Sequence, residues 1–352
     1  MTIAILGLSI TSSWGNGHAT TYRALVRALA QRGHRVQFFE RDVEWYASNR
    51  DLPSSPHWQT IIYDSVEVLR TWKSAIRSAD VVIVGSYVPE GATVIDWVLD
   101  AAKGVRAFYD IDTPVTVERL QQGTCDYLRA EQVREFDLYL SFTGGSILRR
   151  LEEQFQAGMA RPLYCAVDPE RYQPTGEIEQ WHLGYLGTYS ADRQPALNLR
   201  LMEPARRWRV GRFVVAGPQF PTELDWPPNV DRIEHLSPAD HASFYCAQRF
   251  TLNVTRAAMI DAGYSPSVRL FEAAACGTPI ISDEWTGLGE FFEPGREILV
   301  TRSADETLAY VRDLPERDRK AIASRARTRV LSRHTASHRA EELEQHLTDA
   351  RN

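Results

Sequence analysis

The chain has 352 residues, of which 43% are hydrophobic and 24% charged, a balance typical of globular proteins and not of disordered ones. Forty basic and 46 acidic side chains give a net charge of −6. This excess of acid argues against a dedicated nucleic-acid binder, because neutralising phosphates needs a basic surface. No apolar run approaches the roughly 20 residues that cross a bilayer, which excludes a membrane-spanning helix.

Six short apolar segments in the first half of the chain predict strands. They are rich in Val, Ile, Leu and Phe with little alternation, which is typical of strands covered on both faces in a parallel sheet. The segments are 3–8, 36–40, 81–85, 105–109, 138–142 and 162–165. Between the first two, the apolar spacing of Tyr22, Leu25, Val26 and Leu29 predicts a helix, and Gly33 fits its end.

A polar, proline-containing segment at 168–179 predicts a linker. Strands and helices then alternate again, and polar helices follow from residue 315 onward. The predicted strands of the second half are 183–186, 212–216, 230–234, 250–254, 279–282 and 298–300. We therefore predict an α/β chain with two doubly wound, Rossmann-like parallel-sheet domains facing a cleft. The domains are 1–168 and 180–335, followed by a C-terminal helix at 336–352.

The compartment is predicted from the cysteines and the first strand. Cys125, Cys165, Cys246 and Cys276 are widely spaced and form no Cys-x-x-Cys motif, so reduced thiols are expected rather than a zinc site or a disulfide framework. No basic residue precedes the apolar segment 3–8, which distinguishes it from a signal peptide. A cytoplasmic protein is the expectation.

Ligands of parallel α/β sheets bind beyond the carboxyl ends of the strands, so the loops there hold the candidate residues. Gly15 and Gly17 follow the first strand and allow a ligand to approach the backbone. Neither the dinucleotide fingerprint nor the P-loop pattern is present. His18, at the start of the next helix, is either a plain helix residue or a catalytic base.

Asp110 follows the strand 105–109 and is a second candidate base. Asp110 and Asp112 have a spacing that oxygen-ligated metals use. The alternative is an ordinary helix start, because Asp112 suits an N-cap and Pro114 an early helix position. That alternative leaves Asp110 unexplained, and we expect no metal site.

Two stretches of the second half carry the candidate binding residues. The first is the loop after strand 183–186, where Gly187 and Thr188 precede Arg193 and would suit a diphosphate. The second is 265–283, a short helix followed by Gly-Thr-Pro and an apolar strand. In that helix Arg269 and Glu272 share one face. They either form a surface salt bridge, or Glu272 binds ribose hydroxyls while Arg269 faces a phosphate.

At this second stretch the chain resembles the GT-B glycosyltransferases. The resemblance rests on the sequence FEAAACGTPIIS at 271–282, which is similar to their donor-binding signature. The sequences RLFE at 269–272 and EFFEPGRE at 290–297 resemble the CgeB-like branch (glycosyltransferase family 1/4-type). The resemblance implies that Glu272 is the ribose-binding second glutamate of the E-x7-E motif, that Arg193 binds the diphosphate and that Gly187 is the loop glycine.

Two positions depart from the pattern of that family. The first glutamate of E-x7-E falls on Tyr264, which removes a carboxylate near the donor sugar. The arginine expected after the loop glycine is Thr188, so Arg269 is the candidate for the second positive charge. We keep both positions among the expected nucleotide-sugar-binding residues, together with Gly15 and Gly17.

The predicted activity is transfer of a sugar from a nucleotide-sugar donor to an unidentified acceptor. The donor is a UDP-, GDP- or dTDP-sugar and acts as substrate, with no cofactor and no metal, because arginines and a helix N-terminus can stabilise the leaving diphosphate. Retention is favoured over inversion; an inverting reaction would use His18 or Asp110 as base. The alternatives are a nucleotide-sugar epimerase and an inactive nucleotide-sugar-binding protein.

Seven basic residues and one acid lie between residues 317 and 333. A basic helix can attract an anionic membrane surface. Its apolar residues form only a narrow stripe without Trp or Phe. We therefore expect a helix packed on its own domain, and peripheral membrane contact is the alternative not favoured.

Overall fold

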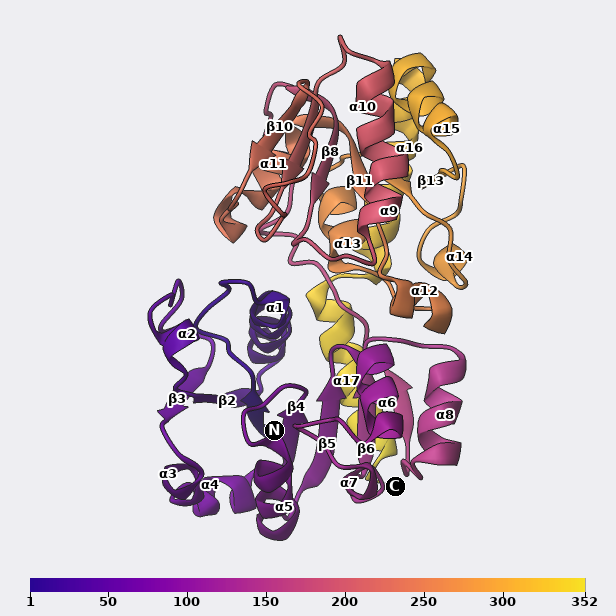
Figure 1. Cartoon of the computed structure of the whole chain (residues 1–352). Helices are drawn as coiled ribbons and strands as arrows, with labels where there is room; N and C mark the ends of the chain where they lie inside the picture. The colour runs from indigo at the N-terminus through magenta and orange to yellow at the C-terminus, as the bar shows by residue number, and fades with distance from the viewer. Residues whose placement is uncertain (352) are drawn as a thin grey trace. The chain divides into compact units, whose positions relative to one another are not determined.

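The computed structural model describes residues 1–351, which form two compact units (Figure 1). The first unit comprises Met1–Ala166 together with the segment from Ala336 onward, and the second is Val167–Thr335. The predicted linker at 168–179 thus falls at the start of the second unit. The predicted C-terminal helix belongs to the first unit.

The first unit contains a seven-stranded sheet whose neighbouring strands all run parallel. The strand order is β3-β2-β1-β4-β5-β6-β7, so β4 is central, and the chain winds outward from the neighbouring strands β1 and β4 in opposite directions. The strands are β1 Thr2–Gly7, β2 Arg35–Arg41, β3 Gln59–Tyr63, β4 Val81–Gly85, β5 Val105–Asp110, β6 Leu138–Ser141 and β7 Ala160–Pro162. The carboxyl ends of β1, β4 and β5 therefore meet at one edge.

Helices connect and cover these strands. They are α1 Gly17–Gln31, α2 Glu44–Ala47, α3 Val66–Arg70, α4 Lys73–Ser78, α5 Gly91–Ala101, α6 Thr113–Gln122, α7 Ala130–Val133, α8 Ser146–Gln154 and α17 Ala336–Asp349. Helix α17 packs on α1 and completes the core with Ala340, Leu343 and Leu347. Its Glu344 accepts hydrogen bonds from Arg32, at 2.6 and 2.8 Å. Residues more than 300 positions apart thus share one core.

The second unit contains a six-stranded parallel sheet in the order β10-β9-β8-β11-β12-β13. Its strands are β8 Trp181–Leu186, β9 Phe213–Ala216, β10 Val230–Ile233, β11 Gln248–Asn253, β12 Ile280–Ser282 and β13 Leu299–Val300. Its α-helices are α9 Gln194–Leu197, α10 Glu203–Arg207, α11 His241–Cys246, α12 Ala257–Ala262, α13 Val268–Ala275, α14 Leu288–Phe291, α15 Ala304–Leu308 and α16 Glu316–Arg333. A π-helical turn, Asn198–Met202, joins α9 to α10 (Figure 1), and a second, Ala309–Asp313, follows α15.

The basic residues of α16 have partners within their own unit. Arg319 pairs with Glu179 and Glu316, both at 2.6 Å. Arg329 pairs with Glu297 at 2.9 Å. Further partners are Glu316 for Lys320, the Arg296 carbonyl for Arg325 and the Ala275 carbonyl for Arg327. These contacts agree with the expected packed helix. Within residues 1–351, no helix is long and apolar enough to cross a membrane.

Candidate functional site

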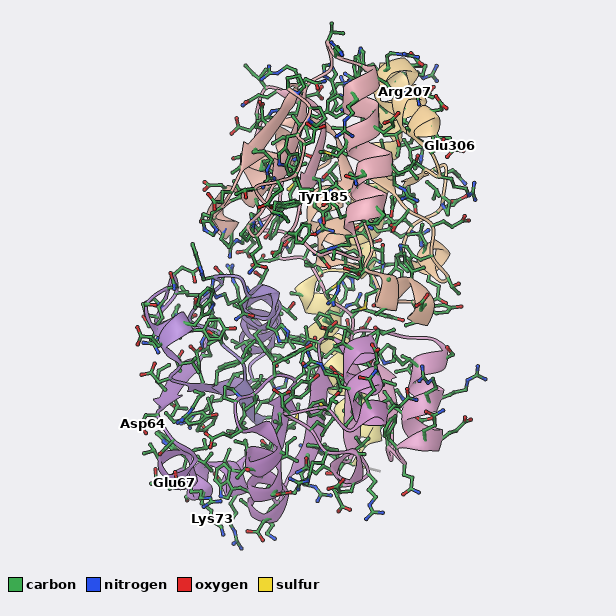
Figure 2. All side chains as sticks on the ribbon, viewed as in Figure 1. Asp64, Glu67, Lys73, Tyr185, Arg207 and Glu306 are labelled. Carbon is green, nitrogen blue, oxygen red and sulfur yellow. The ribbon has the colours of Figure 1, made fainter. Side chains whose placement is uncertain are left out.

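The loops after β8, β11 and β12 lie at one edge of the second sheet. Parallel register places Tyr185 beside Leu252 and Asn253 beside Ser282, so these strands end together. Figure 2 labels Tyr185 near the end of β8. The loop with Gly187 and the loop after β11 are therefore neighbours at the edge where such sheets bind ligands.

Gly187 is required by close packing. A Cβ atom there would lie 2.8 Å from the guanidinium of Arg269 and 2.7 Å from the Tyr185 hydroxyl. A side chain there would displace the Tyr185 hydroxyl or the Arg269 guanidinium, so glycine lets the loop lie directly against Arg269. The sequence places Gly187 and Arg269 82 residues apart, and the fold places them in contact.

Arg269 is anchored by neutral groups. It is only 9% exposed, and its Nη1 donates to Asn253 Oδ1 at 3.1 Å and to Ser267 Oγ at 3.4 Å. Its Nε donates to the Leu186 carbonyl, and the guanidinium lies 5.0 Å from the centre of the Tyr185 ring. Since no partner is a carboxylate, the positive charge of Arg269 is oriented but not neutralised.

Arg193 adds a second charge beside it. Its Nη2 donates to the Thr188 carbonyl at 2.7 Å, while its Nε is buried with no hydrogen-bond partner. Burial, together with the nearby charges of Arg269 and Arg256, lowers the pKa of Arg193. Among residues 1–351, no carboxylate forms an ion pair with Arg193 or Arg269. Mutually repelling, unneutralised cations beside a glycine loop are suited to bind an anion.

Arg256 was missed by the sequence analysis, as was the network that places it. Asp283 accepts hydrogen bonds from the Thr255 amide at 2.9 Å and from its hydroxyl at 2.8 Å. Asn253 donates to Thr255 and to Ser282. In a neighbouring loop, Asp192 accepts from the Ala257 amide at 3.0 Å. One indication was available in the sequence. Asn253 lies at the end of a strand and Asp283 directly after one, and such positions are where residues of a binding site are expected.

Glu272 lies on α13 and does not pair with Arg269, so the salt-bridge alternative is wrong. Its side chain is buried, at 4% exposure, and Oε2 accepts from the Tyr245 hydroxyl at 3.0 Å. The Tyr172 hydroxyl lies 3.4 Å from His241 Nδ1 and within the electrostatic reach of Glu272. Burial, aided by the Glu272 charge, raises the pKa of both tyrosines well above the ordinary value. Neither tyrosine was predicted, since they lie 27 and 100 residues away in sequence.

Tyr264 stands where the first glutamate of E-x7-E was expected. Its backbone is left-handed, with φ of 48°, and its amide donates to the Thr286 carbonyl at 2.6 Å. A Cβ on Gly287 would lie 2.5 Å from the Tyr264 ring. Tyr264 therefore fixes the loop that leads into α13, and it supplies no carboxylate.

His18 lies at the carboxyl edge of the first sheet, within the first unit. Asn16 caps α1 by accepting from the His18 amide at 3.0 Å. The His18 ring meets the Tyr87 ring edge-on at 5.5 Å, and its Nδ1 is buried without a hydrogen-bond partner. Burial lowers the pKa of His18 to about 4, which keeps the imidazole neutral. Side chains at Gly15 and Gly17 would meet no atom within 4 Å.

Asp110 is fully buried and held by protein groups. It accepts from Tyr139 at 2.6 Å, from Thr116 at 2.8 Å and from the Asp112 amide at 3.2 Å. Burial raises the pKa of Asp110 to about 6. Asp112 instead accepts from Tyr87, and α6 begins at Thr113, as the helix-start interpretation predicted. The two carboxylates thus have separate partners, and His18 is the more accessible candidate base.

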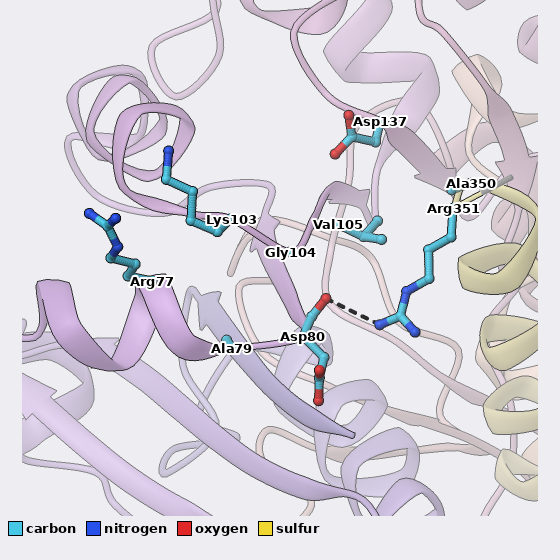
Figure 3. Close-up of a pocket in the computed structure, with 9 residues that line it drawn as sticks. All are labelled: Arg77, Ala79, Asp80, Lys103, Gly104, Val105, Asp137, Ala350 and Arg351. Atoms are coloured by element: carbon cyan, nitrogen blue, oxygen red, sulfur yellow. Dashed lines mark hydrogen bonds between the residues drawn. The ribbon is translucent and has the colours of Figure 1, made fainter.

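A cavity of about 680 Å³ opens at the other edge of the first sheet. Figure 3 shows its lining, which includes Arg77, Lys103 and Arg351, with Arg351 donating to the Asp80 carbonyl at 3.3 Å. Asp80 and Gly104 directly precede β4 and β5, so the cavity lies at the amino ends of the strands. Because ligands of such sheets bind at the carboxyl ends, this cavity is not part of the candidate site.

The comparisons with known proteins agree with this geometry. Residues 193–345 match a family model described as glycosyl transferase-like. The sucrose-phosphate synthase of Thermosynechococcus elongatus superposes with a TM-score of 0.74 at 16% identity, covering 98% of each chain. The fold is GT-B. The GT-B prediction is confirmed for both sheets.

Two further GT-B structures were solved with nucleotides. HepE of Anabaena, in complex with UDP and glucose, has a TM-score of 0.70 at 11% identity over 99% of this chain and 100% of its own. An α-glucosyltransferase in complex with UDP has a TM-score of 0.71 at 13% identity, with the same coverage, and has also been solved with DNA. No curated protein sequence matches the chain. Both the family model and the fold agree with the expected glycosyltransferase class.

Proposed function

We propose that this protein transfers a sugar from a uridine diphosphate-linked donor to an acceptor. The observation that carries the proposal is the pair Arg193 and Arg269, whose charges meet at the glycine loop without a carboxylate partner. Such an arrangement is electrostatically unfavourable until an anion binds. UDP is chosen among the expected nucleotides because the structures of similar fold were solved with UDP.

The second unit would bind the nucleotide. Arg193 and Arg269 would stabilise the diphosphate as it leaves, with α13 presenting its N-terminus nearby. Glu272 would accept hydrogen bonds from the ribose. The Tyr245 hydroxyl occupies one acceptor position of Oε2, and the carboxylate keeps further acceptor positions for a ribose hydroxyl.

The first unit would bind the acceptor, whose identity the residues do not specify. A retaining reaction remains our preference, because it requires no protein base. His18 is neutral, which a base must be, but a pKa of about 4 makes it a poor proton acceptor. In the inverting alternative, substrate binding has to raise that pKa. Asp110, which is enclosed by Tyr139 and Thr116, would hold the loop rather than touch substrate.

We further propose that the transfer needs no metal, since two arginines offer the positive charge that a divalent ion would otherwise supply. Membership of the CgeB-like branch and a cytoplasmic location remain expectations from residues 269–297 and from the first strand. No observation favours an epimerase.

A donor panel tests the proposal. The purified chain is incubated with UDP-, GDP- and dTDP-sugars, and the release of free nucleoside diphosphate is measured. We expect slow release from one UDP-sugar, which an acceptor accelerates. Isomerisation of the sugar, or binding without any turnover, would contradict the proposal. The variant Arg193→Met should lose the release, whereas the matched control Arg206→Met, which replaces an exposed arginine of α10, should keep it.

A further inference from the structure

Two cysteines that are 30 residues apart in sequence are neighbours in the second unit. Cys246 ends α11, and Cys276 directly follows α13. The Cys246 Sγ lies 3.6 Å from the Cys276 carbonyl oxygen and 3.8 Å from the Gln173 carbonyl oxygen, so the two cysteines are in direct contact. The Thr278 hydroxyl, donating to the Tyr245 carbonyl at 2.7 Å, holds the two segments together.

The two thiols differ in access and acidity. Cys246 is half-buried, whereas Cys276 is 3% exposed. The neighbouring Cys276 side chain, with further contributions from Thr175, lowers the pKa of Cys246 to about 6. The same pairing raises the pKa of Cys276. Cys246 is therefore the reactive thiolate, and Cys276 is a resolving thiol beside it.

This pair adjoins the groups that hold Glu272. Tyr245, which donates to Glu272, directly precedes Cys246. The Cys276 amide donates to the Glu272 carbonyl at 3.0 Å, one helical turn away. Any movement of the two sulfurs toward each other thus shifts both the Glu272 backbone and its tyrosine partner.

We propose that Cys246 and Cys276 form a reversible disulfide that lowers nucleotide affinity. The oxidant is a hydroperoxide. The Cys246 thiolate attacks the peroxide, its O–O bond breaks, and a sulfenic acid and hydroxide form. The Cys276 sulfur then attacks the sulfenic sulfur, forming the S–S bond and releasing water. In total, two thiols lose two electrons and two protons while one peroxide becomes two waters.

Nucleotide binding is affected because the distance between the two sulfur atoms shortens when the disulfide forms. In a disulfide the two sulfur atoms of Cys246 and Cys276 must lie about 2.05 Å apart. That shift pulls the ends of α11 and α13 together and displaces Tyr245 against Glu272. This part of the proposal rests on the proposed nucleotide site, whereas formation of the disulfide does not.

The test uses the full chain, reduced and then exposed to hydrogen peroxide. Peptide mapping identifies the cross-linked residues, and thiol titration counts the free thiols that are lost. Calorimetry measures the affinity for UDP before and after reduction with dithiothreitol. We expect loss of two thiols, a 246–276 cross-linked peptide and at least a fivefold weaker affinity that reduction restores. Cys125→Ser, whose cysteine lies in the first unit, should behave as the parent does. Cys246→Ser should not respond to peroxide.

Three results separate the possible failures. Sulfinate on Cys246 without a cross-link would overturn the proposed disulfide. A cross-link with unchanged UDP affinity would overturn its effect on binding. If the reduced chain binds no UDP, the proposed nucleotide site fails, and the peptide map still decides the disulfide.

Discussion

Replacing Arg193 with methionine should separate binding from stability. The substitution removes a half-buried cation whose pKa is lowered by burial and by Arg269 and Arg256. It also removes the hydrogen bond to the Thr188 carbonyl, which contributes about 1 kcal/mol. Relief of the buried charge offsets that loss, so the free energy of unfolding without ligand should change by less than about 1 kcal/mol.

Nucleotide affinity should respond much more strongly. A charge-assisted hydrogen bond contributes about 1.5–3 kcal/mol, which corresponds to roughly 10- to 150-fold weaker UDP binding. Uridine lacks the diphosphate, so its affinity should not change. At a UDP concentration of about 100 times the parent Kd, ligand stabilises the fold by about 2.7 kcal/mol. In the variant, a tenfold weaker Kd leaves about 1.4 kcal/mol of this stabilisation, and a hundredfold weaker Kd about 0.4.

Calorimetry with UDP and uridine, together with urea unfolding with and without UDP, provides the assay. Arg206→Met is the matched control, because it removes an exposed arginine paired with Asp225 outside the cluster. Equal losses for UDP and uridine would show that Arg193 supports the fold and not a diphosphate. A drop of more than about 2 kcal/mol in unfolding free energy without ligand would refute the electrostatic argument.

Three other predictions concern Glu272, the removal of metal ions and the protonation of His18. Glu272→Gln should weaken UDP and uridine binding equally, by about 1.5–3 kcal/mol in calorimetry, because it addresses the ribose that both share; a larger loss for UDP would contradict that role. Treatment with EDTA should leave sugar transfer unchanged, and activity that returns only with Mn²⁺ would contradict the metal-independent mechanism. His18 has a folded pKa of about 4, below its ordinary value of 6.5, so the unfolded chain binds more protons between these values. Its contribution to stability is therefore complete above pH 6.5 and is lost as the pH falls toward 4. Urea unfolding of His18→Gln should show a smaller loss over this range than the parent, and an equal or larger loss would contradict the burial of His18.

The buried strands could be predicted because their composition alone identifies them. Strands such as β4 and β9 are apolar along their length and buried at every position. The strand β3, Gln59–Tyr63, was missed because it is an edge strand with exposed positions among buried ones. Its apolar run, residues 61–63, is too short to indicate a buried strand from composition alone.

The candidate site was only partly predictable. Gly187, Arg193 and Glu272 could be proposed because each belongs to a local pattern in the sequence. The hydrogen bond from Tyr245 to Glu272 could not, since a contact between distant segments leaves no periodic or spacing signal. For the same reason the contact between Cys246 and Cys276 could not be predicted. Their wide spacing in the sequence predicted separate thiols, and the fold places them side by side.

The path of the last helix decides the order in which the two cores can be completed during synthesis. The second unit is one continuous segment, Val167–Thr335, so all of its core residues have emerged from the ribosome before α17 is made. The first unit lacks Ala340, Leu343 and Leu347 until that moment. Although it is begun first, it is finished last, and until then the surface of α1 that α17 will cover stays open to solvent.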